Sequence, residues 1–312
     1  MQSFVNMISF DGAFPSETVP RLTLAVGVFD GVHLGHRQIL RTTCEVAHSN
    51  GSIACAVTFD PHPRSVFGYP PELLVPFKER KRRLRACGAE IIGTINFSKE
   101  VAALEPQDFL LALINDRRFE LAGICVGEHW HFGKAGMGGK ELLSDFAEKY
   151  HFAFRAVPEL YDGKEIISSS SVRQLFSSGN LERGAAMLGA SCQLSGKVVK
   201  GFGVAGNKLA APTANLDVEC GIIPPDGVYA GQVKINGAHL PAAVNIGVAP
   251  TFNVGKRRVE IHLLDWNGDL YDSEITLEIV KFIRSERKFA SADDLKKQIA
   301  LDITDIRNAL NI

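Results

Sequence analysis

The chain has 312 residues, of which 46% are hydrophobic and 22% are charged, a balance typical of a folded globular protein and not of a largely disordered one. At roughly 150 residues per domain, this length predicts two domains. Its 34 Lys and Arg residues are balanced by 35 Asp and Glu residues. The chain therefore has no excess of positive charge, which excludes the usual electrostatic signature of a nucleic-acid-binding protein.

The six cysteines are scattered along the chain, and no two of them have CxxC spacing. Cys55 lies in the apolar run SIACAVTF, where a reduced thiol packs as a small hydrophobic group. We therefore expect reduced thiols, with metal binding or disulfides as the alternative. The N-terminal MQSFVNMISFDG lacks the pattern of a signal peptide, and nowhere do 18 apolar residues follow one another. These features predict a cytoplasmic protein without a membrane partner.

Up to about residue 160, short apolar segments alternate with segments of helical periodicity. This alternation predicts βαβ units and an α/β domain with a doubly wound parallel sheet. In such a sheet the ligand site lies beyond the carboxyl ends of the strands. The expected strands are Leu22–Phe29, Ile53–Phe59, Glu90–Asn96, Gly123–Val126 and Phe152–Val157, and the expected helices are His36–His48, Lys78–Cys87, Pro106–Asn115 and Gly139–Tyr150.

The pattern changes after Gly189 to short segments with two-residue alternation, which predict a small antiparallel β-barrel. Before it, Val172–Leu188 is expected to be a helix interrupted at Gly179–Asn180. After it, Ser291–Leu310 is expected to be a terminal helix with Ser291 as its cap. We therefore place residues 1–187 in the sheet domain and residues 188–312 in the barrel domain. The expected barrel strands are Gly196–Lys200, Val228–Ile235, Ala242–Ile246, Val259–Leu264 and Ile275–Ile283, with hairpin signals at Asn236-Gly237 and Asn267-Gly268.

The segment GVFDGVHLGHRQIL, Gly27–Leu40, joins the first strand to a helix. Gly27 and Gly31 permit a tight turn, and His33 and His36 share one face of the first helical turn. The helix N-terminus favours a phosphate, and the two imidazoles can stabilise charge that develops on a leaving pyrophosphate. A lone HxxH would instead indicate packing, capping or a zinc pair. The unbroken strand–turn–helix context favours the phosphate site.

Gly27–His36 resembles the signature of the nucleotidyltransferase superfamily, in the form found in bacterial bifunctional riboflavin kinase/FMN adenylyltransferases (FAD synthetases). Three later segments resemble further parts of this family in the same order: FDPHP at Phe59–Pro63, VGEHWHFG at Val126–Gly133 and ISSSSVR at Ile167–Arg173. The resemblance implies the following assignments. ATP and its phosphates are bound by Gly27, Phe29, Asp30, Gly31, Ser169 and Ser170; His33, His36 and Arg173 are catalytic; and Asp60, His62 and Trp130 bind flavin.

Two of these segments can also be interpreted from their residues alone. Hydroxyl groups at a helix start, followed one turn later by Arg173, can hold an oxyanion, although a serine-rich cap with a solvated arginine has the same pattern. His129, Trp130 and His131 stand where the family usually has Asp or Asn, Phe and Arg; Trp130 can still stack on an isoalloxazine ring. The basic run KERKRRLR, Lys78–Arg85, is expected to be a solvated helix face, with a polyanion-binding patch as the alternative.

A second group of motifs lies in the barrel domain. Gly201, Gly203 and Gly206 form a flexible loop that lets backbone N–H groups approach phosphates. The following PTAN, Pro212–Asn215, resembles the riboflavin kinase signature. The resemblance implies that Gly201 and Gly203 bind ATP and that Thr213 and Asn215 hold Mg²⁺–ATP, and oxygen donors of this kind suit Mg²⁺. Later segments resemble the same family: PDGVYAG at Pro225–Gly231, NIGVAPTF at Asn245–Phe252, VEIHLLD at Val259–Asp265, DLY at Asp269–Tyr271 and IRSERKF at Ile283–Phe289.

Glu260 is the candidate catalytic base of this domain. Val259 and Ile261 alternate onto the opposite face of the strand, so Glu260 can accept the proton of the ribityl 5′-hydroxyl during phosphoryl transfer. An ordinary solvent-facing glutamate is the alternative. The chain also departs from the family pattern, because Ala210 and Ala211 replace a Gly and a Phe, and Asn253 and Asp272 stand where Gly is common.

The sequence thus predicts an enzyme with two consecutive reactions. The barrel would phosphorylate riboflavin with Mg²⁺–ATP to give FMN, and the sheet domain would join FMN to the AMP part of a second ATP, giving FAD and pyrophosphate. One alternative is an FMN adenylyltransferase whose kinase domain is impaired or merely binds flavin. Another is a flavin-binding or flavin-sensing protein without turnover. The presence of HxGH, PTAN and Glu260 favours the enzyme.

Overall fold

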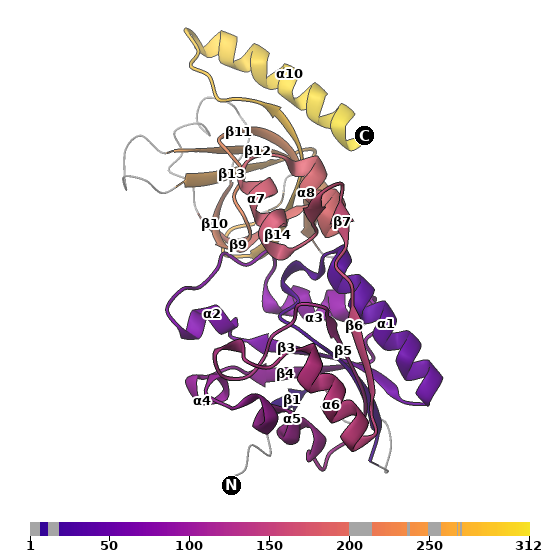
Figure 1. Ribbon diagram of the computed structural model, residues 1–312. Coiled ribbons are helices and arrows are strands. Elements are labelled where there is room, and N and C mark those ends of the chain that lie inside the picture. Colours follow the sequence, from indigo (N-terminus) through magenta and orange to yellow (C-terminus); the bar gives the residue numbers. More distant parts are fainter. Residues whose placement is uncertain are drawn as a thin grey trace. The chain divides into compact units, whose positions relative to one another are not determined.

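The computed structural model describes residues 7–11, 19–199, 214–235, 238–248, 257–266, 268 and 270–312 (Figure 1). Contacts between Cα atoms divide the chain into two units. The first, which we call the sheet unit, comprises Met1–Pro71 and Phe77–Ser168, and the second, the barrel unit, comprises Glu72–Pro76 and Ser169–Ile312. This division by contacts groups residues 169–187 with the barrel. The functional boundary at residue 188 stays a prediction.

The sheet unit contains a six-stranded sheet with the order β1-β4-β3-β2-β5-β6. Strands β2 to β6 are mutually parallel, as the alternating pattern predicted, whereas β1 pairs antiparallel with β4. The sequence did not indicate β1, because its three residues are too few to show an alternation. The strands are β1 (Ile8–Phe10), β2 (Arg21–Val26), β3 (Ile53–Asp60), β4 (Ile91–Asn96), β5 (Glu120–Gly127) and β6 (Ala153–Val157).

Side chains of the central strands alternate between two cores, one on each face of the sheet. Leu24 of β2 packs in one core with Phe109 and Leu143, which come from α5 and α6. Its neighbour Ala25 packs in the other core with Leu40 of α1. The sheet is therefore covered on both faces, which confirms the predicted doubly wound architecture. The helices of this unit are α1 (Leu34–Asn50), α2 (Pro63–Val66), α3 (Phe77–Ala86), α4 (Lys99–Ala102), α5 (Pro106–Ile114) and α6 (Lys140–Tyr150), with 3₁₀ turns η1 (Asp30–Val32) and η2 (Lys134–Gly136).

The strand order reverses at β2, which fixes where a ligand crevice is expected. After β2 the chain adds β3 and β4 on one side, and it then returns to place β5 and β6 on the other side. Ligands of open α/β sheets bind at such a reversal, beyond the carboxyl ends of the strands. The segments that follow β2, β3 and β5 therefore form the candidate site.

The barrel unit contains a closed six-stranded barrel with the order β10-β13-β12-β11-β14-β9, and each pair of neighbours is antiparallel. This confirms the predicted antiparallel barrel. The sequence did not indicate β10. Only Leu216 of this strand is buried, so its residues show no clear alternation of apolar and polar side chains. The strands are β9 (Cys192–Val199), β10 (Ala214–Cys220), β11 (Gly227–Ile235), β12 (Ala238–Val248), β13 (Arg257–Leu263) and β14 (Glu274–Arg284).

The terminal helix α10 (Ala292–Leu310) packs on the barrel through Ile306 and Leu310. Ser291 caps it, as predicted, by accepting a hydrogen bond from the N–H of Asp294 at 3.1 Å. An ion pair between Arg284 of β14 and Asp302 of α10, with N–O distances of 2.7 and 2.8 Å, also joins the helix to the barrel. Because Asp302 is almost fully buried, this pair fixes where along the barrel the helix lies.

The predicted helix at Val172–Leu188 is in fact two helices, α7 (Ser169–Ser177) and α8 (Leu181–Leu188), separated at Gly179 and Asn180 as the sequence indicated. A two-stranded sheet of β7 (Tyr161–Asp162) and β8 (Glu165–Ile166) precedes them. The hairpin residues at 236, 237 and 267 lie outside the described residues, although the flanking strands β11 and β12 pair antiparallel. Over the described ranges, no helix combines the length and apolar character needed to cross a membrane.

Candidate active sites

The turn after β2 has an unusual backbone conformation. Phe29, Gly31 and Val32 all have positive φ angles, of 55°, 78° and 54°. Gly31 adopts this conformation without strain, but for the β-branched Val32 it is rare. Gly27 permits close packing at this turn, because a Cβ there would lie 3.1 Å from the Phe29 ring, and its predicted contact with ATP stays a prediction. The glycine thus makes room for Phe29, which is fully buried, as is the predicted phosphate residue Asp30.

His33 ends this turn and caps helix α1. Its Nδ1 accepts a hydrogen bond from the N–H of His36 at 3.4 Å, and the two imidazole rings stack with centroids 3.6 Å apart. A Cβ on Gly35 would lie 3.2 Å from the His33 ring, so the glycine in HxGH permits this packing. The capping interpretation that the sequence left open therefore holds for His33. This cap is compatible with phosphate binding. A neutral ring whose Nδ1 accepts a hydrogen bond carries its proton on Nε2, which can donate to a phosphate oxygen.

His36 is held in its neutral form. Burial, followed by the nearby His33 and Arg80, lowers its pKa well below the usual value. Its Nδ1 is buried and has no hydrogen-bond partner within the described part of the chain. A neutral imidazole donates a hydrogen bond without bringing a full charge, and an approaching polyphosphate would raise its pKa again. The pair of rings is therefore suited to respond to negative charge that develops beside them.

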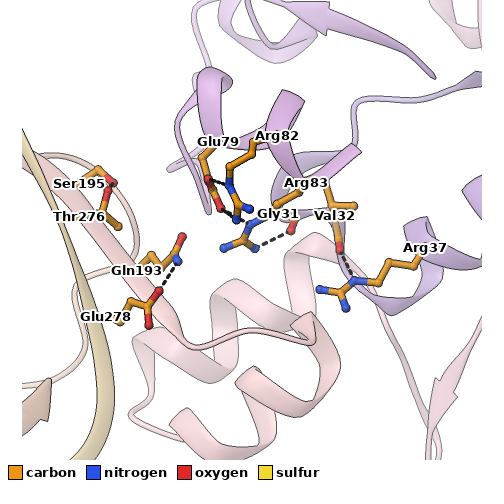
Figure 2. Close-up of polar contacts among 10 residues, drawn as sticks. All are labelled: Gly31, Val32, Arg37, Glu79, Arg82, Arg83, Gln193, Ser195, Thr276 and Glu278. Atoms are coloured by element: carbon orange, nitrogen blue, oxygen red, sulfur yellow. Dashed lines mark hydrogen bonds and ion pairs between the residues drawn. The ribbon is translucent and has the colours of Figure 1, made fainter. Parts of the chain in front are cut away.

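Two arginines of the basic run in α3 do not lie on a solvated face, and the expectation for them was wrong. Arg80 is 1% exposed and Arg83 is 6% exposed. Arg80 donates to the carbonyl oxygens of Val28 and Phe59 at 3.3 and 3.1 Å. Arg83 donates to the carbonyl oxygen of Gly31 at 2.9 Å, as Figure 2 shows. The sequence contained a signal for this, because α3 has few apolar residues with which to fill the helix face that contains Leu84.

The residues assigned to flavin binding follow β3 and β5, on either side of the β2 turn. Asp60 is the last residue of β3 and is exposed, and His62 caps α2 by accepting from the N–H of Arg64 at 3.1 Å. Trp130 is half-buried and stacks on Phe132, with ring centroids 4.8 Å apart. These side chains therefore follow strands that flank the predicted phosphate site, and their contact with flavin stays a prediction.

Ser169, Ser170 and Arg173 all lie on α7, within the barrel unit. Arg173 follows the two serines by one helical turn, which places their side chains on a common face. Its Nε donates to the carbonyl oxygen of Glu72 at 2.7 Å, so the arginine is not simply solvated. Their predicted role at the ATP phosphates stays a prediction.

In the barrel, Glu260 lies at the centre of a row of polar side chains. It pairs in register with Asn215 of β10 on one side and with Asn245 of β12 on the other. Val259 and Ile261, its neighbours along β13, are each 1% exposed and face the barrel core, so the row lies on the outer face. Directly opposed residues on antiparallel strands have Cβ atoms about 4.5–5.5 Å apart. The structure therefore brings Glu260 and Asn215 together, and it adds Asn245, which the sequence did not single out.

Asn215 supplies an oxygen suited to a metal ion. Its Oδ1 is buried and has no hydrogen-bond partner among the residues that the structure describes. A buried acceptor of this kind is costly unless a ligand satisfies it. Beside the carboxylate of Glu260 it forms the hard oxygen environment that Mg²⁺ prefers. The other predicted residues of this site, Gly201, Gly203 and Thr213, lie outside the described residues, as do Ala210, Ala211 and Asn253.

One departure from the family pattern has a structural explanation. Asp272 has a φ of 63°, a left-handed conformation that favours glycine and that aspartate tolerates better than most residues. Its carboxylate forms an ion pair with Lys197 at 3.0 Å. The substitution is therefore compatible with the turn that glycine would otherwise make.

Comparison with known proteins covers both halves of the chain. The family model for FAD synthetase matches residues 16–171, and the model for riboflavin kinase matches residues 188–310. The bifunctional riboflavin kinase/FMN adenylyltransferase of Escherichia coli K12 is 34% identical over 89% of this chain and 90% of its own length. The protein of the same name from Bacillus subtilis 168 is 31% identical over 92% of each chain.

A solved structure has a similar fold over most of the chain. It is described as a macrolide-efflux protein from Streptococcus pneumoniae, and it superposes with a TM-score of 0.82 at 28% identity. The match covers 93% of this chain and 95% of that one. Both the sheet fold and the barrel fold thus occur together in a crystal structure.

Proposed function

The chain belongs to the family of bifunctional riboflavin kinase/FMN adenylyltransferases, and from this premise we propose that it makes FAD from riboflavin in two steps. The first step transfers the γ-phosphoryl group of ATP to riboflavin and gives FMN and ADP. The second joins FMN to the AMP part of another ATP and releases pyrophosphate. The observation that carries the proposal is that this single chain holds both the histidine pair after β2 and the Asn215–Glu260 pair in the barrel.

The kinase step is assigned to the barrel. Glu260 accepts the proton of the ribityl 5′-hydroxyl as that oxygen attacks the γ-phosphorus. Asn215 and, by resemblance, Thr213 hold Mg²⁺ together with the ATP phosphates, and Gly201 and Gly203 of the same loop approach those phosphates. When bound, Mg²⁺ neutralises charge on the phosphate oxygens. The buried Oδ1 of Asn215 opposite Glu260 supports this assignment.

The adenylyltransferase step is assigned to the predicted domain of residues 1–187, which contains the histidine pair of the sheet unit and helix α7. The FMN phosphate attacks the α-phosphorus of ATP, and His33 and His36 donate hydrogen bonds to the oxygens of the leaving pyrophosphate. The accepting role of His33 Nδ1 supports a donating Nε2 on that ring. By resemblance, Ser169, Ser170 and Arg173 are assigned to the ATP phosphates, and Asp60, His62 and Trp130 to the flavin.

Three finer points belong to the same proposal. Mg²⁺ is required in both steps, and the functional boundary lies near residue 188, where the riboflavin kinase match begins. The protein acts in the cytoplasm, which is in keeping with cysteines that form no disulfide among the described residues. Its partners are the small molecules riboflavin, FMN, FAD and ATP.

A product assay with riboflavin as the sole flavin tests the proposal. Purified protein incubated with riboflavin and Mg²⁺–ATP is expected to form FMN first and then FAD, as resolved by chromatography. If riboflavin stays unchanged while supplied FMN is converted to FAD, the chain is an FMN adenylyltransferase only. Binding of flavin without any product would contradict both enzymatic functions.

Two substitutions test the division of labour. His36→Ala is expected to stop FAD formation while FMN still accumulates, because only the sheet unit loses a hydrogen-bond donor. Glu260→Ala is expected to stop FMN formation while supplied FMN is still converted to FAD. An equal loss of both activities in either variant would contradict the assignment of one step to each unit.

A further inference from the structure

The turn Val28–Val32, which leads directly into His33, is held in place by arginines from elsewhere in the chain. Three of its five residues have positive φ angles, and Val32 is β-branched. Such a backbone persists only where its surroundings hold it. The position of His33 and His36 therefore depends on whatever holds this turn.

Three guanidinium groups donate to carbonyl oxygens of the turn. Arg80 donates to Val28 at 3.3 Å, Arg83 to Gly31 at 2.9 Å, and Arg37 to Val32 at 3.2 Å. The contacts of Arg83 and Arg37 are shown in Figure 2. Arg37 belongs to the same helix as the histidines, whereas Arg80 and Arg83 come from α3, which follows a different strand. The two arginines of α3 therefore tie the turn to a separate element of the sheet unit.

The two arginines of α3 make their contacts from almost fully buried positions. Arg80 also donates to the carbonyl of Phe59 at 3.1 Å, so that it bridges the carboxyl ends of β2 and β3. Arg83 donates from its Nε to Glu79 at 2.9 Å. The planar fork of Arg83 thus meets a carboxylate and the carbonyl oxygen of Gly31 at once, and the carboxylate balances its buried charge.

Glu79 stays ionised and so fixes Arg83. Burial would raise the pKa of Glu79, but hydrogen bonds from Arg82 and Arg83 outweigh it and lower the pKa. Arg82 binds the same carboxylate at 2.6 and 2.8 Å, but its side chain is 64% exposed. Arg82 and Arg83 thus share one partner and differ in burial and in the contact of Arg83 with Gly31.

We propose that Arg83, oriented by Glu79, and Arg80 are positioning residues for adenylyl transfer, which hold the Val28–Val32 turn so that His33 and His36 meet the leaving pyrophosphate. This inference rests on the proposed role of the two histidines. Neither arginine touches the reacting atoms; each acts through the backbone of the turn. A displacement of catalytic groups by about 1 Å costs on the order of a hundredfold in rate, so contacts of this kind are decisive.

The test compares Arg83→Met with Arg82→Met. We expect Arg83→Met to lower kcat for conversion of FMN to FAD about tenfold to a hundredfold and to leave KM for ATP and the riboflavin kinase rate of the same polypeptide unchanged. Arg82→Met, on the same helix and bound to the same carboxylate, is expected to keep the wild-type kcat. Arg83→Lys is expected to retain part of the rate, because it keeps the charge but not the fork.

A second measurement does not depend on activity. In ¹⁵N-histidine NMR spectra, wild-type His33 is expected to show an accepting Nδ1 and a protonated Nε2. Arg83→Met is expected to remove this signature, and Glu79→Gln, which keeps the arginine but removes the ion pair, is expected to weaken it. A wild-type protein that fails to convert FMN would contradict the proposed function, while these spectra would still test the inference.

Three results would overturn the positioning role. The first is a wild-type kcat together with an unchanged His33 signature in Arg83→Met. The second is an equal loss of kcat in Arg82→Met. The third is a parallel fall of the adenylyltransferase and kinase rates in Arg83→Met, which would show general loss of folded protein.

Discussion

In the sheet unit the two histidines come from one continuous stretch of chain, whereas in the barrel Asn215, Glu260 and Asn245 come from three strands. His33 caps α1 and His36 lies in its first turn, directly after a turn with three positive φ angles. The barrel row needs no unusual backbone, because strand register alone places its side chains opposite one another. The first site therefore depends on backbone conformation, and the second depends on pairing between strands.

This difference predicts how each site fails. A change that shifts the Val28–Val32 turn should impair chemistry without removing any reacting group. In the barrel, register is fixed by many pairs at once, so that loss of one side chain should remove only the function of that side chain. The substitutions below test this contrast, from the largest expected effect to the smallest.

His33 caps α1, and its proposed chemical role is a separate one, which two substitutions distinguish from the cap. Both His33→Ala and His33→Asn are expected to lower FMN adenylylation about a hundredfold to a thousandfold, because each removes a donor to the leaving group. Only His33→Ala should also destabilise the sheet unit, by about 1 kcal/mol, because asparagine is a good helix cap. Product formation measures the first effect, and denaturant unfolding measures the second.

The stability measurement needs a probe for one unit. Trp130 lies in the sheet unit and Trp266 in the barrel unit, and the chain has no other tryptophan. In a Trp266→Phe background, fluorescence therefore reports unfolding of the sheet unit. Wild-type FAD formation in His33→Asn would show that His33 acts only as a cap.

Asn215→Ala should affect the barrel alone. Loss of the buried Oδ1 is expected to raise the Mg²⁺ concentration for half-maximal riboflavin phosphorylation by about tenfold to a hundredfold, since a hydrogen bond or ligand contact of a charged group contributes ~1.5–3 kcal/mol. The Mg²⁺ dependence of FAD formation from FMN should not change. Mg²⁺ titration of the two reactions measures both.

Ser195→Ala is a matched control for Asn215→Ala. Its hydroxyl lies 3.0 Å from that of Thr276, on the neighbouring strands β9 and β14 (Figure 2). Ser195→Ala removes a polar group from the same barrel and should leave the Mg²⁺ concentration for half-maximal kinase activity unchanged. An equal shift in both variants would contradict a specific role for Asn215.

The lowered pKa of His36 predicts a pH-dependent stability of the sheet unit. The unfolded chain protonates this histidine near its usual pKa of about 6.5, whereas the folded protein, with its pKa lowered, does so only at lower pH. The unfolded state therefore binds more protons below pH 6.5. This contribution to stability is fully present above that pH and is lost as the pH falls, by at most ~1.4 kcal/mol per pH unit.

His36→Gln should flatten this dependence. The free energy of unfolding of the sheet unit is measured at pH 7.5 and at pH 5.5 by Trp130 fluorescence. Its difference between the two pH values is expected to be smaller in the variant than in the wild type. An identical difference in the two proteins would mean that His36 titrates normally in the folded state.

Gly35→Ala is expected to have the smallest effect. Its Cβ would lie 3.2 Å from the His33 ring and 3.3 Å from the carbonyl oxygen of Ile167. Relief of this crowding is expected to displace the ring at a cost of about 1 kcal/mol, which corresponds to roughly a fivefold loss of rate in FAD formation. The kinase rate of the same chain is the internal control, and a fall in that rate would contradict a local effect.

Much of the fold was predictable because its signals are local. The βαβ alternation predicted the parallel strands, and two-residue alternation predicted the barrel. The cap at Ser291 and the break near Gly179 followed from single residue types whose backbone preferences are strong. The strand β1 was missed because its pairing with β4 is decided by contacts distant in sequence.

The candidate sites divide in the same way. His33 and His36 were found because their spacing and their neighbouring glycines lie within one segment. Arg80 and Arg83 were misjudged, since the helical pattern of a basic run does not reveal which of its guanidinium groups will meet buried carbonyl oxygens. Asn245 was not singled out, because its closeness to Glu260 depends on the register of β12 against β13.

The sequence by itself determined the two architectures and the order of the motifs, and it supplied the candidates for the reacting side chains, because periodicity, turn residues and motif spacing are local properties of the chain. Only the tertiary structure decided which charges are buried, which strand residues face one another and how the Val28–Val32 turn is held. These depend on groups far apart in sequence that meet only when the free energy of packing the whole unit brings them together.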